Sequence, residues 1–204
     1  MTNRIEEAVR ETLSPKRAQH SFAVAQQTDR MASFFGLDRG EAELLHRAAL
    51  LHDLTKEIPL EEQIEYLAEG GVSPTEDDLL AGETLHALSG ALKAREEFAL
   101  PEPFCDAIRR HSTGDRVMTL YDKLLFVADY IEPNRPHESC RAQSELFWNG
   151  ISGATSQEEN VEILDRVVYN IANETVIYLI KKDMFVHPNT LWMRNALAFK
   201  VKGR

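Results

Sequence analysis

The sequence predicts an all-α fold in a single domain. Apolar residues recur at helical spacing along nearly all of the 204 residues, and Gly, Pro and capping residues separate one periodic stretch from the next. No stretch alternates as a convincing strand does, and the chain has no internal repeat. A chain of this length can bury one full core. We therefore expect a helical bundle over about residues 16–135, with the helices of residues 140–204 packed on it.

Capping residues and helix breakers give the expected boundaries of the helices. Ser, Thr, Asp or Asn at a helix start accepts a hydrogen bond from a free N–H of the first turn, and Gly or Pro ends the helix. In the first half, the predicted helices run from Asn3 to about Leu13, from Ser14 to about Phe35, from Asp38 to about His52, from Pro59 to about Leu67, from Ser73 to before Gly82, and from Thr84 to Phe98. In the second half, they run from Pro101 to His111, from Thr119 to Ile131, from about Ser139 to about Gly150, through Val161 to Tyr178, and from Asn189 to about Val201.

The charge balance is acidic, with 33 Asp and Glu against 23 Lys and Arg and a formal net charge of −10. Binding to a nucleic-acid backbone needs clustered Lys and Arg, so no nucleic-acid partner is expected. A small anionic substrate remains compatible with this charge, because metal ions can reverse the local field inside an acidic protein.

The sequence carries no sign of export or membrane insertion. Cys105 and Cys140 form neither a metal-type CxxC nor a disulfide framework, which fits a reducing compartment. The N-terminal residues lack an apolar signal core, and no apolar run approaches the roughly 18 residues that a membrane span needs. We expect a cytoplasmic protein without a membrane partner.

The stretch from Ala48 to Lys56 ends an apolar helical run in the adjacent pair His52 and Asp53. A carboxylate beside an imidazole at the inner end of such a run is costly unless it is paired. A metal ion is one suitable partner, because oxygen and imidazole ligands together bind divalent iron, manganese or zinc. Alone, a His-Asp pair is a weak signal.

Further His and Asp residues fall on stripes that should face the interior. His20 lies at one end of an apolar stripe, His111 follows Ile108 on another, and Asp129 lies within a strongly apolar helix. A single inward histidine is commonly a core residue bonded to a backbone carbonyl. Several imidazoles together with two carboxylates need a common charge partner, which metal ions supply. The candidate ligands are His20, His52, Asp53, His86, His111 and Asp129.

The pattern H…HD…D, formed by His20, His52 with Asp53, and Asp129, resembles the minimal metal set of the HD-domain superfamily of metal-dependent phosphohydrolases. His86 and His111, between the HD pair and the last Asp, resemble its two-metal version. The HDxxK pattern alone is shared across that superfamily.

A closer resemblance is to the YqeK family, whose members are symmetrical diadenosine tetraphosphate hydrolases. It covers about residues 16–200. Thr55 and Ser112 stand where Ala and Thr are usual, and neither is a candidate ligand. The stretches that carry the resemblance are RAQHS at 17–21, LHDLTK at 51–56, LHALSGA at 85–91, RHSTG at 110–114, ADYIEPNR at 128–135 and, more weakly, PNTLWMRN at 188–195.

The resemblance implies a two-metal site in which Asp53 bridges the ions, each taking one carboxylate oxygen. A water shared by the ions would attack an inner phosphorus of diadenosine tetraphosphate, giving two ADP. The expected cofactors are two divalent metal ions, with iron first and manganese, cobalt or zinc also suited to N and O ligands. One ion would be held by His20, His52, Asp53 and Asp129, and the other by Asp53, His86 and His111.

Lys56 and Arg135 join Asp53 as expected catalytic residues, because a lysine or a forked guanidinium near the metal site can bind phosphate. Ser112, Thr113 and Gly114 are further expected substrate contacts, through hydroxyl groups and a backbone N–H. The simpler alternatives are a solvated lysine, a surface ion pair for Arg135 and a helix cap at 112–114. His187, in a turn-like segment, is expected to be solvated.

Other functions remain open. One is a mononuclear HD-type nucleotidase or phosphatase acting on nucleoside phosphates, against which the presence of both His86 and His111 speaks. Another is a nucleotide-binding regulator with an inactive site. An exposed apolar face on the last helices is compatible with a homodimer, and equally with packing inside one chain.

Overall fold

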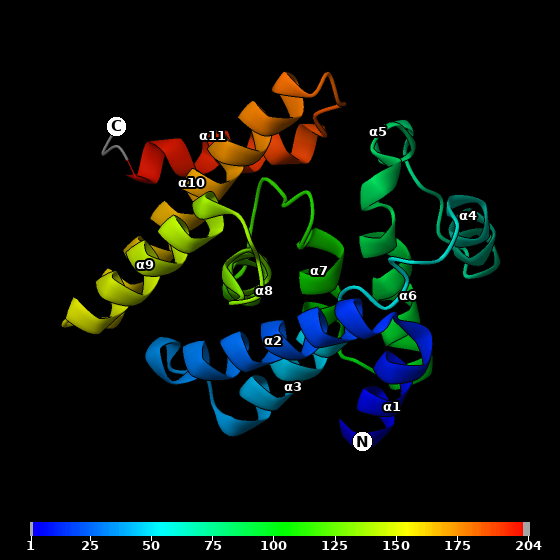
Figure 1. The fold of residues 1–204 in the computed structure, drawn as a ribbon, viewed down its shortest axis with the longest axis horizontal. Helices are drawn as coiled ribbons and strands as arrows, with labels where there is room; N and C mark the ends of the chain where they lie inside the picture. Colours follow the sequence, from blue (N-terminus) through cyan, green and yellow to red (C-terminus); the bar gives the residue numbers. More distant parts are fainter. Residues whose placement is uncertain (1, 202–204) are drawn as a thin grey trace.

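The structure is a computed structural model that describes residues 2–201, and the all-α prediction is confirmed: this range contains helices and no strand (Figure 1). The α-helices are α1 (Thr2–Thr12), α2 (Pro15–Ala32), α3 (Arg39–Leu51), α4 (Leu60–Glu69), α5 (Glu76–Leu80), α6 (His86–Phe98), α7 (Glu102–Arg110), α8 (Leu120–Ile131), α9 (Glu138–Gly153), α10 (Gln157–Lys181) and α11 (Pro188–Val201). Two short 3-10 helices are η1 (Ser33–Phe35) and η2 (Gly82–Thr84).

Several predicted helix starts are confirmed by their caps. The Ser14 hydroxyl accepts a hydrogen bond from the Arg17 N–H, and Pro15 follows at the first helical position of α2. Asp38 and Glu41 form the predicted capping box of α3, each side chain accepting from the other residue's backbone N–H. These starts depend only on neighbouring residues, which explains why the sequence reveals them.

Other predicted boundaries are wrong. Asn3 lies inside α1 instead of capping it, and Thr84 lies in η2, where its hydroxyl donates to the Ala81 carbonyl at 2.9 Å. The helix expected to end near Gly150 continues to Gly153.

A large buried apolar cluster joins most of the helices, with members from Ile5 in α1 to Leu197 in α11. A smaller one, of Leu67, Leu85 and Leu92, packs α4 against α6. Helix α2 packs on α3, and α10 contacts α8, α9 and α11, so the C-terminal helices rest on the rest of the bundle (Figure 1). We propose that the chain folds as one domain with the C-terminal helices packed on its core.

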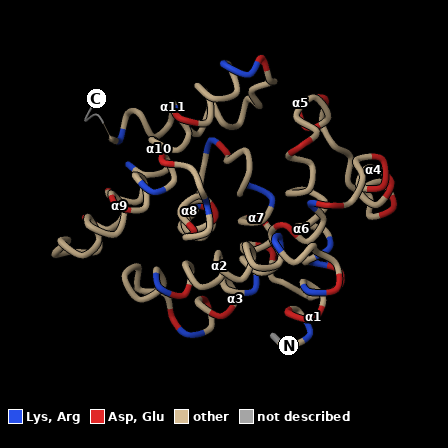
Figure 2. Tube along the Cα trace, in the orientation of Figure 1, with Lys and Arg blue, Asp and Glu red and all other residues tan. Residues whose placement is uncertain are grey.

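The charged and apolar side chains at the surface can be compared with the expectations from composition. Acidic residues cover α4 and the first turn of α5 (Figure 2). None of the helices in residues 2–201 combines the length and apolarity that a bilayer-spanning segment needs. Exposed apolar side chains on α10 and α11 include Ile177, Ile180 and Phe199. The homodimer stays a prediction.

Candidate metal centre

The six predicted ligands lie together near the middle of the bundle. All of them are buried except Asp129, whose side chain is 18% exposed. They come from α2 (His20), the turn after α3 (His52 and Asp53), the start of α6 (His86), the turn after α7 (His111) and α8 (Asp129).

Asp53 stands between two pairs of histidines. Its Oδ2 lies 3.6 Å from His20 Nε2 and 3.5 Å from His52 Nε2. Its Oδ1 lies 3.2 Å from His86 Nε2 and 3.7 Å from His111 Nε2. Each carboxylate oxygen therefore faces one histidine pair.

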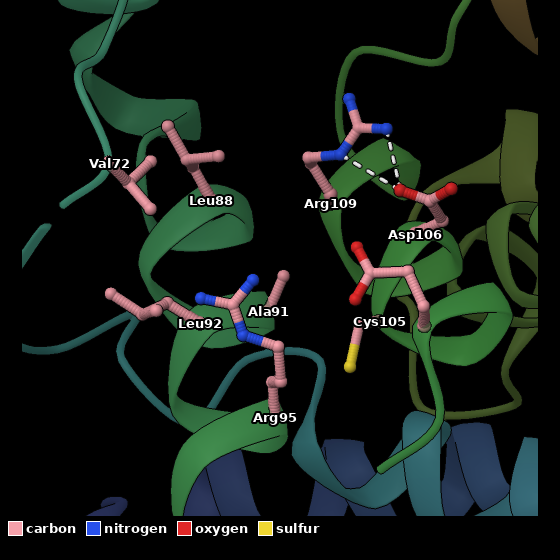
Figure 3. Close-up of a pocket in the computed structure, with 9 residues that line it drawn as sticks. Val72, Leu88, Ala91, Leu92, Arg95, Cys105, Asp106 and Arg109 are labelled. Atoms are coloured by element: carbon pink, nitrogen blue, oxygen red, sulfur yellow. Dashed lines mark hydrogen bonds and ion pairs between the residues drawn. The ribbon is translucent and has the colours of Figure 1, made fainter. Parts of the chain in front are cut away.

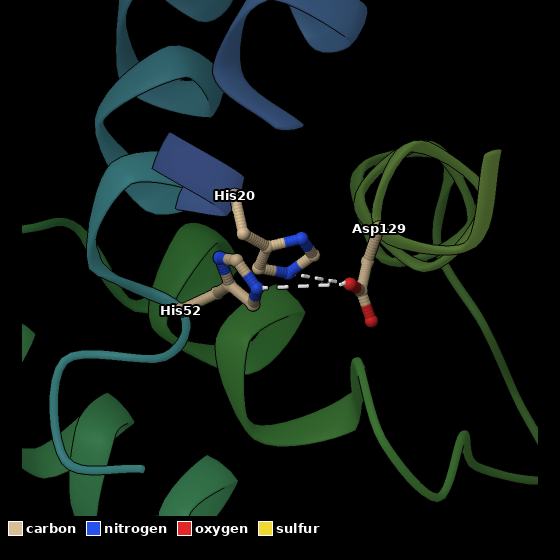
Figure 4. A group of neighbouring side chains, drawn as sticks. All are labelled: His20, His52 and Asp129. Carbon is tan, nitrogen blue, oxygen red and sulfur yellow. Dashed lines mark ion pairs between the residues drawn. The ribbon is translucent and has the colours of Figure 1, made fainter. Parts of the chain in front are cut away.

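Asp129 completes the first group. Its Oδ1 lies 3.0 Å from His20 Nε2 and 3.8 Å from His52 Nε2 (Figure 4). One ligand atom from each of these three residues lies within 4.8 Å of the others, and the same holds for His52, Asp53 and His111. In the histidine pair that faces Asp53 Oδ1, the Nε2 atoms of His86 and His111 are 3.2 Å apart.

Local contacts turn the Nε2 atoms of the histidines toward the centre. In His52, His86 and His111, Nδ1 lies 2.6, 3.0 and 2.6 Å from the carbonyl oxygen of the residue three positions earlier. A carbonyl can only accept, so in His52 and His111 these hydrogen bonds place the proton on Nδ1 and leave a lone pair on Nε2. His86 Nδ1 also has the Lys56 ammonium, a donor, 3.2 Å away. His20 Nδ1 lies 3.2 Å from the Glu132 carboxylate and Nε2 lies 3.0 Å from the Asp129 carboxylate, so a metal ion bound here would replace the proton between Nε2 and Asp129.

Burial favours the neutral, ligating form of two histidines. It lowers the pKa of His52 to about 4, against the opposing charge of Asp53. It also lowers the pKa of His86 to about 4. A neutral imidazole is the form that binds a metal ion.

The other ionisable ligands are governed by their neighbours. Burial would lower the pKa of His20, but the carboxylates of Asp129 and Glu132 outweigh it and raise this pKa to about 9. Burial would raise the pKa of Asp53, but the adjacent His52 and the other histidines hold it well below its usual range. Both carboxylates of the centre are held as anions, since the pKa of Asp129 is also well below its usual range.

These residues fit divalent metal ions. The buried Nε2 atom of His52 makes no hydrogen bond to any described residue, and that of His20 faces only carboxylates, with Asp129 Oδ1 at 3.0 Å. Imidazole lone pairs and carboxylate oxygens converge on the same small volume, and acceptors placed so closely repel one another unless a cation binds between them. The structure thus supplies a charge-based reason for divalent metal at this centre.

A cavity of about 350 Å³ opens beside this centre. Lys56, Ser112 and Arg135, three of the predicted substrate contacts, line it. Ser112 Oγ lies 3.1 Å from His111 Nε2 and 3.3 Å from His86 Nε2. The other predicted contacts, Thr113 and Gly114, do not line it.

Three cations surround this cavity. Arg17 Nη1 lies 2.8 Å from Asp53 Oδ2, and Arg135 pairs with the Asp129 carboxylate and donates from Nε to the Asp129 carbonyl at 3.1 Å. Lys56 donates to the Glu83 carbonyl at 3.0 Å, and burial lowers its pKa. This acidic protein therefore places positive charge where an anionic substrate would approach the metal centre.

The sequence reasoning did not assign Arg17 or Glu132 to the site. Arg17 precedes His20 by three residues on α2, and Glu132 follows Asp129 by three at the end of α8. Residues three apart share a helix face. Their spacing of three residues from His20 and Asp129 could have indicated that Arg17 and Glu132 lie near the candidate ligands.

Thr55, the departure from the usual Ala, has a structural role. Its buried hydroxyl donates to the His86 carbonyl at 2.9 Å and lies 2.8 Å from Ser89 Oγ. It therefore ties the turn that carries Asp53 to the helix that carries His86.

Thr113 and Gly114 lie just after α7 and contact α11. The Thr190 hydroxyl donates to the Thr113 carbonyl at 2.9 Å, and Gly114 has a positive φ of 69°. A Cβ on Gly114 would collide with the buried side chain of Met193. Their predicted contact with substrate stays a prediction.

Gly114→Ala should destabilise the protein by about 2–4 kcal/mol, because it combines a left-handed backbone with overpacking against Met193. Gly71→Ala is the matched control: its φ is 71°, but no atom lies within 4 Å of the added Cβ. We expect that variant to lose only about 1–2 kcal/mol. Urea unfolding measures both values, and equal losses would show that Met193 moves aside without cost.

A separate hollow between α6 and α7 has no part in this centre (Figure 3). None of the six candidate ligands lines it, and there Arg109 pairs with Asp106 at 2.6 Å. Burial raises the pKa of the Cys105 thiol in its wall to about 11, so this cysteine is a poor nucleophile.

Comparison with known proteins decides the family. The HD domain family model matches residues 17–134, more than half of the chain. The chain belongs to the HD-domain family. Membership implies the use of divalent metal ions, and the matched range contains all six candidate ligands of this HD-domain protein.

Curated relatives of this HD-domain protein share nearly its whole length. A protein named symmetrical bis(5'-nucleosyl)-tetraphosphatase from Halalkalibacterium halodurans is 32% identical, with 95% of each chain covered. One of the same name from Bacillus subtilis is 33% identical, with 93% of each covered. The predicted resemblance to the YqeK family is thereby confirmed.

A solved structure agrees with the fold of this HD-domain protein. A crystal structure from Clostridium acetobutylicum, described as a predicted HD superfamily hydrolase involved in NAD metabolism, superposes with a TM-score of 0.85 at 27% identity. The match covers 98% of both chains, so the C-terminal helices are included.

Proposed function

We propose that this protein is a metal-dependent hydrolase that cleaves diadenosine tetraphosphate symmetrically to two ADP. The observation that carries the proposal is the placement of Asp53, whose two oxygens face different histidine pairs. The names of the relatives, which share nearly the whole chain, support the substrate and the symmetrical cleavage.

The proposed ligand sets use all six residues. His20, His52, Asp53 and Asp129 would hold one ion, and Asp53, His86 and His111 the other. Ions bound there would lower the pKa of a water molecule and offset the negative charge that develops on the phosphoryl oxygens. Iron is the first candidate, with manganese, cobalt or zinc as alternatives.

The residues of the chain would bind and orient the phosphates. Arg17, Lys56 and Arg135 approach the cavity from different elements, so a polyphosphate beside the metal centre would meet a cation on several sides. Ser112 adds a hydroxyl next to His86 and His111. Holding the phosphate chain in one orientation selects which phosphorus is attacked.

Product analysis tests the proposal. The full chain, loaded with iron or manganese, should convert each diadenosine tetraphosphate to two ADP, separated by chromatography. The same protein treated with a chelator is the control and should give none. AMP with ATP would contradict symmetrical cleavage, and tight binding without product would indicate a regulator.

A further inference from the structure

A second cavity, of about 360 Å³, lies between the α5–η2 segment and the connection from α10 to α11. Its apolar wall is formed by Leu80, Leu179, Met184 and Phe185. Leu80 is 57% exposed and Phe185 is 39% exposed. Cavities of roughly 300–1,000 Å³ with apolar walls and a few polar groups are typical of small-molecule sites.

This apolar cavity adjoins the one beside the metal centre. Thr84, Ser112 and Thr175 line both. A ligand that places phosphates beside the metal centre would therefore have the apolar cavity as its neighbour on the side of Ser112.

One wall of the apolar cavity is fixed by His187. This residue, expected to be solvated, is 6% exposed, and its Nδ1 accepts a hydrogen bond from the Asn189 N–H. Its buried Nε2 lies 3.4 Å from Asp78 Oδ1, so the ring joins the connection after α10 to α5 behind the cavity.

We propose that the apolar cavity binds one nucleoside of the substrate, with its base against Phe185. The inference rests on the proposed function and adds a recognition site for one end of the molecule. Every nucleobase has an apolar face that stacks on an aromatic ring.

The other neighbouring hollow suits a base less well. It shares Arg17 and Arg135 with the metal cavity, but Pro136 is the one apolar residue in its lining. The two nucleosides of a symmetrical substrate would thus be bound differently, one by apolar contacts and the other by polar groups.

Phe185→Ala should weaken binding of ADP to the metal-loaded protein about tenfold and leave binding of pyrophosphate unchanged. ADP reaches the apolar cavity through its nucleoside, whereas pyrophosphate occupies only the phosphate region. Titration calorimetry with both ligands measures this difference. Phe199→Ala is the matched control, because Phe199 is 68% exposed on α11 and lines none of these cavities.

The outcomes separate this inference from the proposed function. Wild-type affinity of the Phe185 variant for ADP, or an equal loss for ADP and pyrophosphate, would overturn the nucleoside site. Failure of the wild-type protein to form ADP from diadenosine tetraphosphate would overturn the proposed function instead. A selective loss of ADP affinity in the Phe185 variant supports the cavity assignment in either case.

Discussion

Asp53→Asn should lower the kcat for diadenosine tetraphosphate by a factor on the order of 10³ or more. It should also reduce bound metal from about two ions per chain to one or none. Asparagine keeps the shape of the side chain but loses the negative charge, and its amide nitrogen cannot bind a cation. Because Oδ1 and Oδ2 face different histidine pairs, one substitution affects both proposed ions.

Metal content by plasma mass spectrometry and steady-state kinetics measure the two effects. The control is Asp29→Asn, which removes a carboxylate that is 51% exposed and paired with His46 at 3.0 Å on the surface. Circular dichroism of both variants checks that the helices remain. Metal binding and turnover like those of the wild type in the Asp53 variant would refute the bridging role.

The candidate ligands were predictable because each depends on a local pattern. His52 and His111 directly follow helices, where free carbonyl groups of the last turn accept from Nδ1. His20 lies on a buried helix face, and Asp129, although 18% exposed, lies in a helix whose other residues are mostly buried. Spacing along the chain is sufficient to recognise such positions.

Features that depend on contacts between distant elements were not predictable. Arg17 reaches Asp53 only because α2 packs on α3, and His187 is buried because the connection after α10 approaches α5. Gly150 suggested a helix end, but it lies inside α9 because its missing side chain admits Ile163 of α10. In each case the decisive partner is far away in sequence.

The double variant His86→Ala/His111→Ala should bind about one ion per chain and lose turnover by a factor of about 10² to 10³. It removes both imidazoles beside Asp53 Oδ1, whereas His20, His52 and Asp129 keep their arrangement around the first proposed ion. Metal analysis and ADP formation measure the result. His46→Ala is the control, because His46 contacts Asp29 and lines none of the cavities described above.

The number of ions in this experiment separates two enzyme mechanisms. About one ion per chain in the wild type, unchanged in the double variant, would favour a mononuclear nucleotidase in which the second histidine pair is only structural. A fall from two ions to one with loss of turnover would instead assign the second ion to catalysis. Retained binding of pyrophosphate by the double variant would then show that the first ion, with Arg17, Lys56 and Arg135, is sufficient to hold phosphate but not to cleave it.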